Sequence, residues 1–328
     1  MEPIIARAER VFLSNFEPKA WFERAIFYSW YCSVRDCAFC YMSSLPAREF
    51  ARRSPASILA ELLLCRLLGW RIGFISGGIG AFKHEEFFDL LKKMHSVAGE
   101  KLWLNVGFLD KNTLKMYQPY VKGVVASIEC INPELHARVC PSKPTQPYEQ
   151  MLSSAIELNL KTAITIIIGL GETKRDYPKL KRFLQKYRVS KIHFYCLNPQ
   201  KGTAYENQKP PSPEEQAWWI AKTRIDFPSI DIQGGIWLDK VGRVGLLLKA
   251  GANSISKFPA IRYFGSPEAR AIEQQAKSVG REFIGTLTKP PKVDVKRLLA
   301  GLEFESELKA RIAAKLEKYL RKIKAKGF

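Results

Sequence analysis

Three cysteines lie within nine residues near the start of the chain. Cys32, Cys37 and Cys40 have the spacing C-x4-C-x2-C. Three thiolates on one loop can hold three irons of a [4Fe–4S] cube and leave the fourth iron open to a substrate or cofactor. A structural zinc site usually takes four ligands in two separated pairs, whereas the four histidines here are scattered. The spacing therefore favours an iron–sulfur cluster, with zinc or three inert cysteines as the alternatives.

The elements that must position this loop alternate between short apolar runs and segments of helical period. Strands are expected at residues 26–30, 71–75, 102–107, 123–128, 162–168, 191–196, 230–236 and 253–257. Helices are expected at 55–68, 84–95, 148–158, 177–186 and 213–224. This alternation predicts an α/β fold, a (βα)8 TIM-type barrel, although a doubly wound sheet gives a similar pattern. In a barrel, the cysteine loop follows the first strand and lies at the C-terminal face, where active sites form.

Length, apolar runs and charge indicate the domain limits, the location and the partners of the protein. We expect an N-terminal segment at 1–20, the barrel at 21–288 and a basic helical C-terminal extension at 289–328. No apolar run approaches the roughly 18 residues that span a bilayer, and the N-terminus lacks a signal peptide's apolar core. We therefore expect a cytoplasmic protein with no membrane partner. The formal net charge of +20 indicates an acidic protein or a nucleic acid as partner.

The cysteine loop resembles that of the radical S-adenosylmethionine (SAM) enzymes. Their usual spacing is C-x3-C-x2-C, so the first gap here is one residue longer. An aromatic residue precedes the third cysteine in that family, and Phe39 occupies this position. The resemblance implies a [4Fe–4S] cluster on Cys32, Cys37 and Cys40, and SAM with its adenine against Phe39.

Three further stretches resemble SAM-binding segments of that family. Ser76, Gly77 and Gly78 follow the second expected strand, and the resemblance places them at the methionine end of SAM. Glu129 ends the fourth strand, where a carboxylate can accept hydrogen bonds from two ribose hydroxyls. Ile168 and Gly169 end the fifth strand and resemble the adenine-side segment. Two family features are absent, because Ile79 replaces an acidic residue and Thr165 a common glycine.

The chain resembles the biotin synthase branch most closely, over about residues 20–285. Biotin synthase holds a second, sulfur-donating cluster on three cysteines and an arginine. At two of the equivalent strand ends this chain has Ala163 and Ile236. Three other cysteines fall near strand ends at the same face, and they suggest a differently placed auxiliary cluster. These are Cys130, Cys140 and Cys196.

This pattern resembles a subunit of the two-component lipoyl synthase of archaea and some bacteria. The resemblance implies a radical SAM sulfurtransferase of lipoate biosynthesis, which inserts sulfur into a protein-bound octanoyl chain by way of a 5′-deoxyadenosyl radical. The implied partners are an acidic lipoyl-carrier protein, such as an octanoylated glycine-cleavage H protein, or a carrier-derived peptide. A second radical SAM subunit and an electron donor such as ferredoxin are also implied.

Three alternatives remain at the level of sequence. A single-cluster enzyme would rearrange or fragment a small metabolite and would not need Cys130, Cys140 or Cys196. An RNA-modifying radical SAM enzyme would suit the positive charge, but the sequence carries no appended RNA-binding motif, so nucleic acid is the less favoured partner. A basic iron–sulfur scaffold would bind iron without cleaving SAM.

Overall fold

The computed structural model describes residues 3–45 and 51–325. Eight parallel strands close into a barrel, because β1 pairs with both β2 and β8. This confirms the (βα)8 TIM-type fold and excludes the open doubly wound sheet. The strands are β1 (Lys19–Ser29), β2 (Arg71–Gly77), β3 (Leu102–Asn105), β4 (Val121–Glu129), β5 (Lys161–Ile168), β6 (Lys191–Cys196), β7 (Asp231–Gly235), β8 (Ser254–Ser256) and an additional β9 (Glu282–Ile284).

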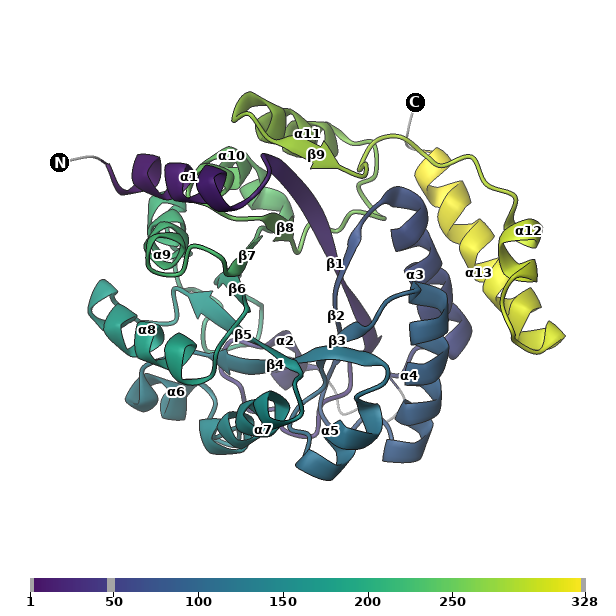
Figure 1. The fold of residues 1–328 in the computed structure, drawn as a ribbon, viewed down its shortest axis with the longest axis horizontal. Helices are drawn as coiled ribbons and strands as arrows, with labels where there is room; N and C mark the ends of the chain where they lie inside the picture. Colours follow the sequence, from purple (N-terminus) through teal and green to yellow (C-terminus); the bar gives the residue numbers. More distant parts are fainter. Residues whose placement is uncertain (1–2, 46–50, 326–328) are drawn as a thin grey trace.

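Helices surround the barrel in the alternating order of the fold (Figure 1). The α-helices are α1 (Ile4–Asn15), α2 (Tyr41–Ser44), α3 (Pro55–Leu68), α4 (His84–Ala98), α5 (Lys111–Tyr117), α6 (Pro133–Val139), α7 (Thr145–Glu157), α8 (Tyr177–Lys186), α9 (Pro213–Asp226), α10 (Val244–Lys249), α11 (Pro267–Ser278), α12 (Val295–Ala300) and α13 (Ser306–Lys324). Two 3-10 helices, Lys174–Asp176 and Leu238–Arg243, precede α8 and α10.

Local sequence signals explain the helix boundaries. Ser54 caps α3 by accepting a hydrogen bond from the Ser57 amide, and proline follows it at the first helical position. Ser212 caps α9 in the same way, with Glu215 completing a capping box. Gly69 ends α3 with a left-handed φ of 67°, which is a common way to close a helix.

The first strand is longer than the sequence predicts. The expected strand began at residue 26, but β1 begins at Lys19, two residues before the expected start of the barrel segment. Its first residues, Lys19, Ala20 and Trp21, pair with β9. The three-residue β9 is too short to give a periodic signal of its own, so the extension could not be recognised from the sequence.

Apolar side chains form two layers. The larger cluster fills the space between the strands and the helices, and it includes Cys65, which is fully buried in α3. The smaller cluster lies inside the barrel and includes Phe74, Val125, Ala163 and Ile167. Helix α13 joins the outer layer by packing along α3 (Figure 1). No helix in the described ranges is both long enough and apolar enough to cross a membrane.

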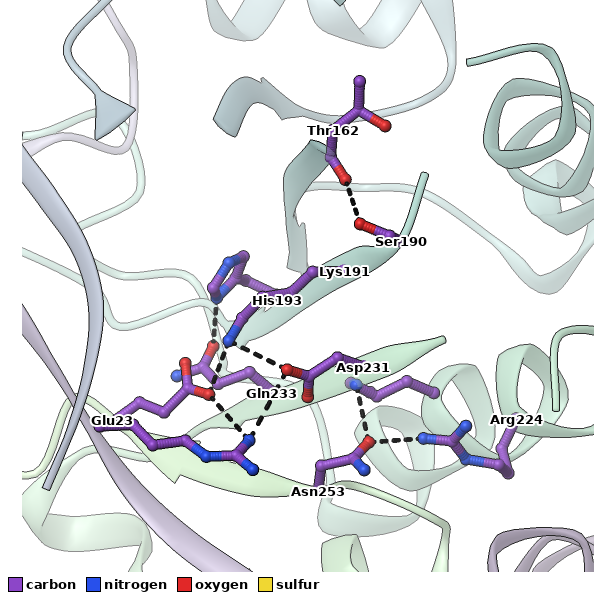
Figure 2. Close-up of polar contacts among 11 residues, drawn as sticks. Glu23, Thr162, Ser190, Lys191, His193, Arg224, Asp231, Gln233 and Asn253 are labelled. Carbon is purple, nitrogen blue, oxygen red and sulfur yellow. Dashed lines mark hydrogen bonds and ion pairs between the residues drawn. The ribbon is translucent and has the colours of Figure 1, made fainter. Parts of the chain in front are cut away.

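A network of charged side chains closes the end of the barrel opposite the cysteine loop (Figure 2). The Lys191 ammonium lies 2.6 Å from Glu23 Oε1 and 3.3 Å from Asp231 Oδ2. Lys191 and Asp231 are the first residues of β6 and β7. His193, one layer further in, bonds Gln233 at 3.0 Å. Because charges this deeply buried need partners, the network fixes how β1, β6 and β7 meet.

Candidate functional site

A cavity of about 230 Å³ opens at the C-terminal ends of the barrel strands. Its wall combines the cysteine loop with residues from the ends of all eight barrel strands or the loops that follow them. The lining includes Phe27, Cys32, Cys37, Phe39, Cys40, Ser76, Gly77, Gly78, Asn105, Glu129, Lys143, Thr165, Ile167, Tyr195, Cys196, Trp237 and Lys257. The location agrees with the general position of active sites in such barrels.

The cysteine loop is fastened to two neighbouring loops. The Ser33 amide donates to the Ile79 carbonyl at 2.9 Å, which ties the loop to the segment after β2. The Ala38 amide donates to the Val139 carbonyl at 2.8 Å, at the end of α6. Asp36 accepts a bond from the Ser142 amide at 3.1 Å. These contacts hold the three cysteines at the cavity wall although the loop itself has no regular structure.

Gly77 and Gly78 allow β2 to approach this loop closely. A Cβ atom on Gly78 would lie 1.7 Å from the Tyr31 carbonyl oxygen and 2.7 Å from Cys32 Cα. On Gly77 it would lie 2.5 Å from the Tyr28 ring. No side chain fits at either position, so Gly78 is required for the cysteine loop to lie where it does and Gly77 for Tyr28 of β1 to pack against β2.

Glu129 ends β4 in a strained backbone conformation, with a φ of +58°. Its carboxylate accepts hydrogen bonds from Lys143 Nζ at 3.2 Å and from Thr165 Oγ1 at 3.0 Å. Burial opposes the charge of Lys143, but Glu129 outweighs this effect and raises the lysine's pKa. A carboxylate held by two side-chain hydrogen bonds therefore lines the cavity.

The chain is similar in sequence to several proteins of archaea and bacteria. The chain is 35% identical to the uncharacterised protein MJ0597 of Methanocaldococcus jannaschii, over 99% of this chain and 97% of that protein. It is 24% identical to the 7,8-didemethyl-8-hydroxy-5-deazariboflavin synthase of Archaeoglobus fulgidus, over 61% of this chain and 65% of that protein. It is 20% identical to the biotin synthase of Thermotoga neapolitana, over 76% of this chain and 87% of that protein. No protein-family model matches the chain.

The fold is also similar to that of a solved structure. The crystal structure of methylornithine synthase superimposes with a TM-score of 0.71 at 17% identity, covering 85% of this chain and 88% of that one. The chain belongs to the radical SAM superfamily, in its biotin synthase-like branch. Membership implies a [4Fe–4S] cluster and SAM as cofactors.

The donor set of this radical SAM protein fits the cluster. Cys32, Cys37 and Cys40 all line the cavity. In the described residues, no three Cys, His, Asp or Glu side chains converge on a single metal ion. A cube does not require such convergence, because each cysteine binds a different iron. Burial raises the pKa of Cys40 to about 11, whereas a hydrogen bond from Cys140 lowers the pKa of Cys37. Cluster binding must deprotonate these thiols.

Five of the seven residues expected to bind SAM line the cavity, and two do not. Phe39, Ser76, Gly77, Gly78 and Glu129 are in the wall. Ile168 instead packs in the outer layer between strand and helix, because side chains alternate along β5 and its neighbour Ile167 points inward. The Gly169 amide is turned away and donates to Glu172 at 2.6 Å.

The three additional cysteines do not converge on one point. Cys196 lines the cavity, where its sulfur accepts a hydrogen bond from Arg243 at 3.3 Å. Cys130 and Cys140 contribute to a second cavity outside the barrel, between α6, α7 and α8. Cys130 directly follows Glu129, the last residue of β4, and belongs to the smaller apolar cluster. Cys140 lies beside Cys37, and their hydrogen bond raises its pKa.

Sequence reasoning missed several residues of the cavity, among them Lys143, Tyr195, Trp237 and Lys257. Lys143 lies in the loop before α7, and its role depends on a contact with Glu129 that only the fold creates. Lys257 directly follows β8, and Tyr195 and Trp237 lie beside it. The ends of β6 and β8 were expected at the C-terminal face of the barrel, and that position was the only signal for these residues.

Proposed function

We propose that this protein removes a hydrogen atom from an unactivated carbon of a substrate that binds in the cavity at the C-terminal face of the barrel. One observation carries the proposal: the three motif cysteines, the two close-packed glycines and Glu129 belong to the wall of one cavity. A [4Fe–4S] cluster on Cys32, Cys37 and Cys40, with SAM bound and an electron from a reductant, would supply the radical chemistry for removing this hydrogen atom, with 5′-deoxyadenosine and methionine as products.

The residues of the chain have distinct tasks in this reaction. Cys32, Cys37 and Cys40 hold the cluster. Gly77 and Gly78 bring the backbone close to it, and Glu129 accepts hydrogen bonds from the ribose of SAM. The apolar rings of Phe27, Phe39 and Phe74 exclude water, which matters because a carbon radical must meet only its intended substrate.

A finer proposal is sulfur insertion into an octanoyl chain, as in a lipoyl synthase subunit. Two features support it. Cys196 presents a thiol at the cavity wall beside Arg243, and Cys140 lies next to the cysteine loop. The net charge of +20 suits an acidic lipoyl-carrier protein or its peptide. In this proposal a second radical SAM subunit and a ferredoxin-like electron donor complete the system, and an auxiliary cluster uses Cys130, Cys140 and Cys196.

The second candidate is a single-cluster enzyme that rearranges or fragments a small metabolite. The separation of Cys130 and Cys140 from Cys196 favours it, because they border different cavities. This candidate needs only Cys32, Cys37 and Cys40 as iron ligands.

Iron counting separates the two candidates. The protein is reconstituted anaerobically, and iron and sulfide are measured in the wild type and in Cys32→Ala/Cys37→Ala/Cys40→Ala. About eight irons that fall to about four support an auxiliary cluster, whereas about four that fall to none support the single-cluster enzyme. Cys65→Ala is the matched control, since Cys65 is buried in α3 and should leave the count unchanged. A wild type that binds iron but forms no 5′-deoxyadenosine from SAM and a reductant would contradict both.

A further inference from the structure

Lys257 occupies an unusual backbone position at the mouth of the barrel. It directly follows β8, lines the cavity and has a φ of +68°. Such a conformation is strained in a residue other than glycine. Asn159 and Arg188 have similar φ values, but both follow the ends of helices, where this conformation is common. Lys257 follows no helix. Glu129, on the opposite wall, also has a positive φ.

The surroundings of the Lys257 ammonium contain rings and no partner anion. Its nitrogen lies 4.4 Å from the centre of the Tyr195 ring, 5.7 Å from Trp237 and 5.9 Å from Phe27. Within the described residues, no hydrogen bond or ion pair reaches it. Burial lowers the pKa of Lys257, and the charges of Glu129 and Cys40, neither of which forms an ion pair with it, only partly offset this effect. Aromatic faces stabilise a cation, but they do not neutralise its charge.

The other cation of the cavity differs in this respect. Lys143 is paired with Glu129 at 3.2 Å, on the wall formed by β4 and β5. Lys257 projects from β8, which lies four strands from β4 in the closed barrel. The cavity therefore has one cation paired with Glu129 and, on the wall opposite Glu129, one cation without an ion pair in the described residues.

We propose that Lys257 binds a carboxylate group of the substrate and thereby selects small carboxylic acids for this enzyme. The inference rests on the proposed function and deepens it. A carboxylate supplies the missing anion, and its tail then extends over the apolar floor formed by Phe74 and Ile167. A neutral octanoyl amide would leave Lys257 without a partner. SAM carries the same chemical group, and the glycines assigned to its methionine end follow β2, two strands from β8, so the test must separate the two sources of carboxylate.

The test measures binding to the reconstituted holoenzyme without turnover. Calorimetric titrations use straight-chain carboxylates from butyrate to decanoate, each paired with its primary amide. In the wild type, at least one carboxylate should bind about ten-fold more tightly than its amide. Lys257→Met should abolish this preference and Lys257→Arg should retain it. Lys249→Met, an exposed lysine on α10, is the matched control and should bind like the wild type.

A second arm separates the two sources of carboxylate. SAM affinity is measured by equilibrium dialysis in the same variants, and it should not change in Lys257→Met. A ten-fold loss of SAM affinity there would assign Lys257 to the methionyl carboxylate and overturn the proposal. The absence of any carboxylate preference in the wild type would also overturn it. If Lys257→Met does not fold, Lys257→Asn replaces it, because asparagine tolerates this φ. Failure of the proposed function would instead appear as missing iron or missing SAM cleavage.

Discussion

Backbone strain in this protein is concentrated where the chemistry is expected. Outside helix ends, three residues other than glycine have a positive φ in the described ranges: Arg35 in the cysteine loop, Glu129 and Lys257. Strain of this kind persists only when surrounding contacts over-determine it. Glu129 has such contacts in Lys143 and Thr165. At the scale of single residues, the cavity is therefore a preorganised site.

The close approach of Gly78 to the cysteine loop gives a prediction at this scale. In Gly78→Ala, the new methyl group cannot fit 1.7 Å from the Tyr31 carbonyl, so the loop must move. Displacing a catalytic group by about 1 Å can cost roughly 100-fold in rate. We expect a loss of this size in SAM cleavage, together with reduced iron content and an unchanged circular dichroism spectrum. Gly301→Ala is the control, because its Cβ would meet nothing within 4 Å.

The sequence singles out residues whose type itself carries a signal. Cysteine spacing and paired glycines pointed to Cys32, Cys37, Cys40, Gly77 and Gly78, and all five line one cavity. Whether a strand side chain points into or out of the barrel was harder to predict. Ile167 belongs to the smaller, inner cluster and its neighbour Ile168 to the outer one, because side chains alternate along β5. Strand register, which no single residue specifies, decides these cases.

At the scale of elements, α3 connects the barrel to the C-terminal helix. Glu61 on α3 accepts bonds from Arg24 of β1 at 2.7 Å and from Arg53 at 2.5 Å. Arg53 also donates to the Tyr319 hydroxyl on α13 at 3.1 Å. Helices with caps, such as α3 and α9, were predictable almost to the residue. The extra length of β1 was not, since it depends on pairing with β9, which is distant in sequence.

The Glu61 cluster predicts how stability depends on pH. Burial raises the pKa of Glu61, but Arg24 and Arg53 outweigh it and hold the pKa below the ordinary 4.5. A lowered pKa stabilises the folded state above about pH 4.5, and this contribution is lost as the pH falls through the folded value. Urea unfolding at pH 7 should show Glu61→Gln less stable by about 3 kcal/mol. The difference should shrink at acid pH, and Glu157→Gln, from an exposed pair, should cost under about 1 kcal/mol. An equal loss at both pH values would contradict this account.

At the scale of the whole molecule, the two ends of the barrel have different roles. The end with Glu23, Lys191 and Asp231 is closed by paired charges (Figure 2). The other end holds the cavity, the cysteine loop and an ammonium without a partner anion. The alternating sequence pattern was sufficient to predict the barrel and the end that carries the cysteines. It could not predict the charge network, which joins residues up to 168 positions apart.

Net charge supplies a prediction that belongs to the molecule as a whole. Beyond the barrel, α13 carries six exposed basic residues, Arg311, Lys315, Lys318, Arg321, Lys322 and Lys324. Together with the net charge of +20, they favour an acidic macromolecule near this surface. If the substrate is an octanoyl chain on an acidic carrier protein, its affinity should fall about ten-fold or more between 50 and about 300 mM salt, because exposed charges are screened.

The salt response also distinguishes the other substrates. A small carboxylate bound to the enclosed Lys257 should lose little affinity over this range, since buried pairs are screened weakly. An RNA should lose far more, about 1,000-fold or greater when many phosphates are contacted. Binding of the carrier, the carboxylate and an RNA is therefore measured across the same salt series, with a charge-neutralised α13 variant as control. A carrier affinity that is independent of salt would remove the electrostatic argument for a protein-bound substrate. The small carboxylic acid would then be the favoured substrate class.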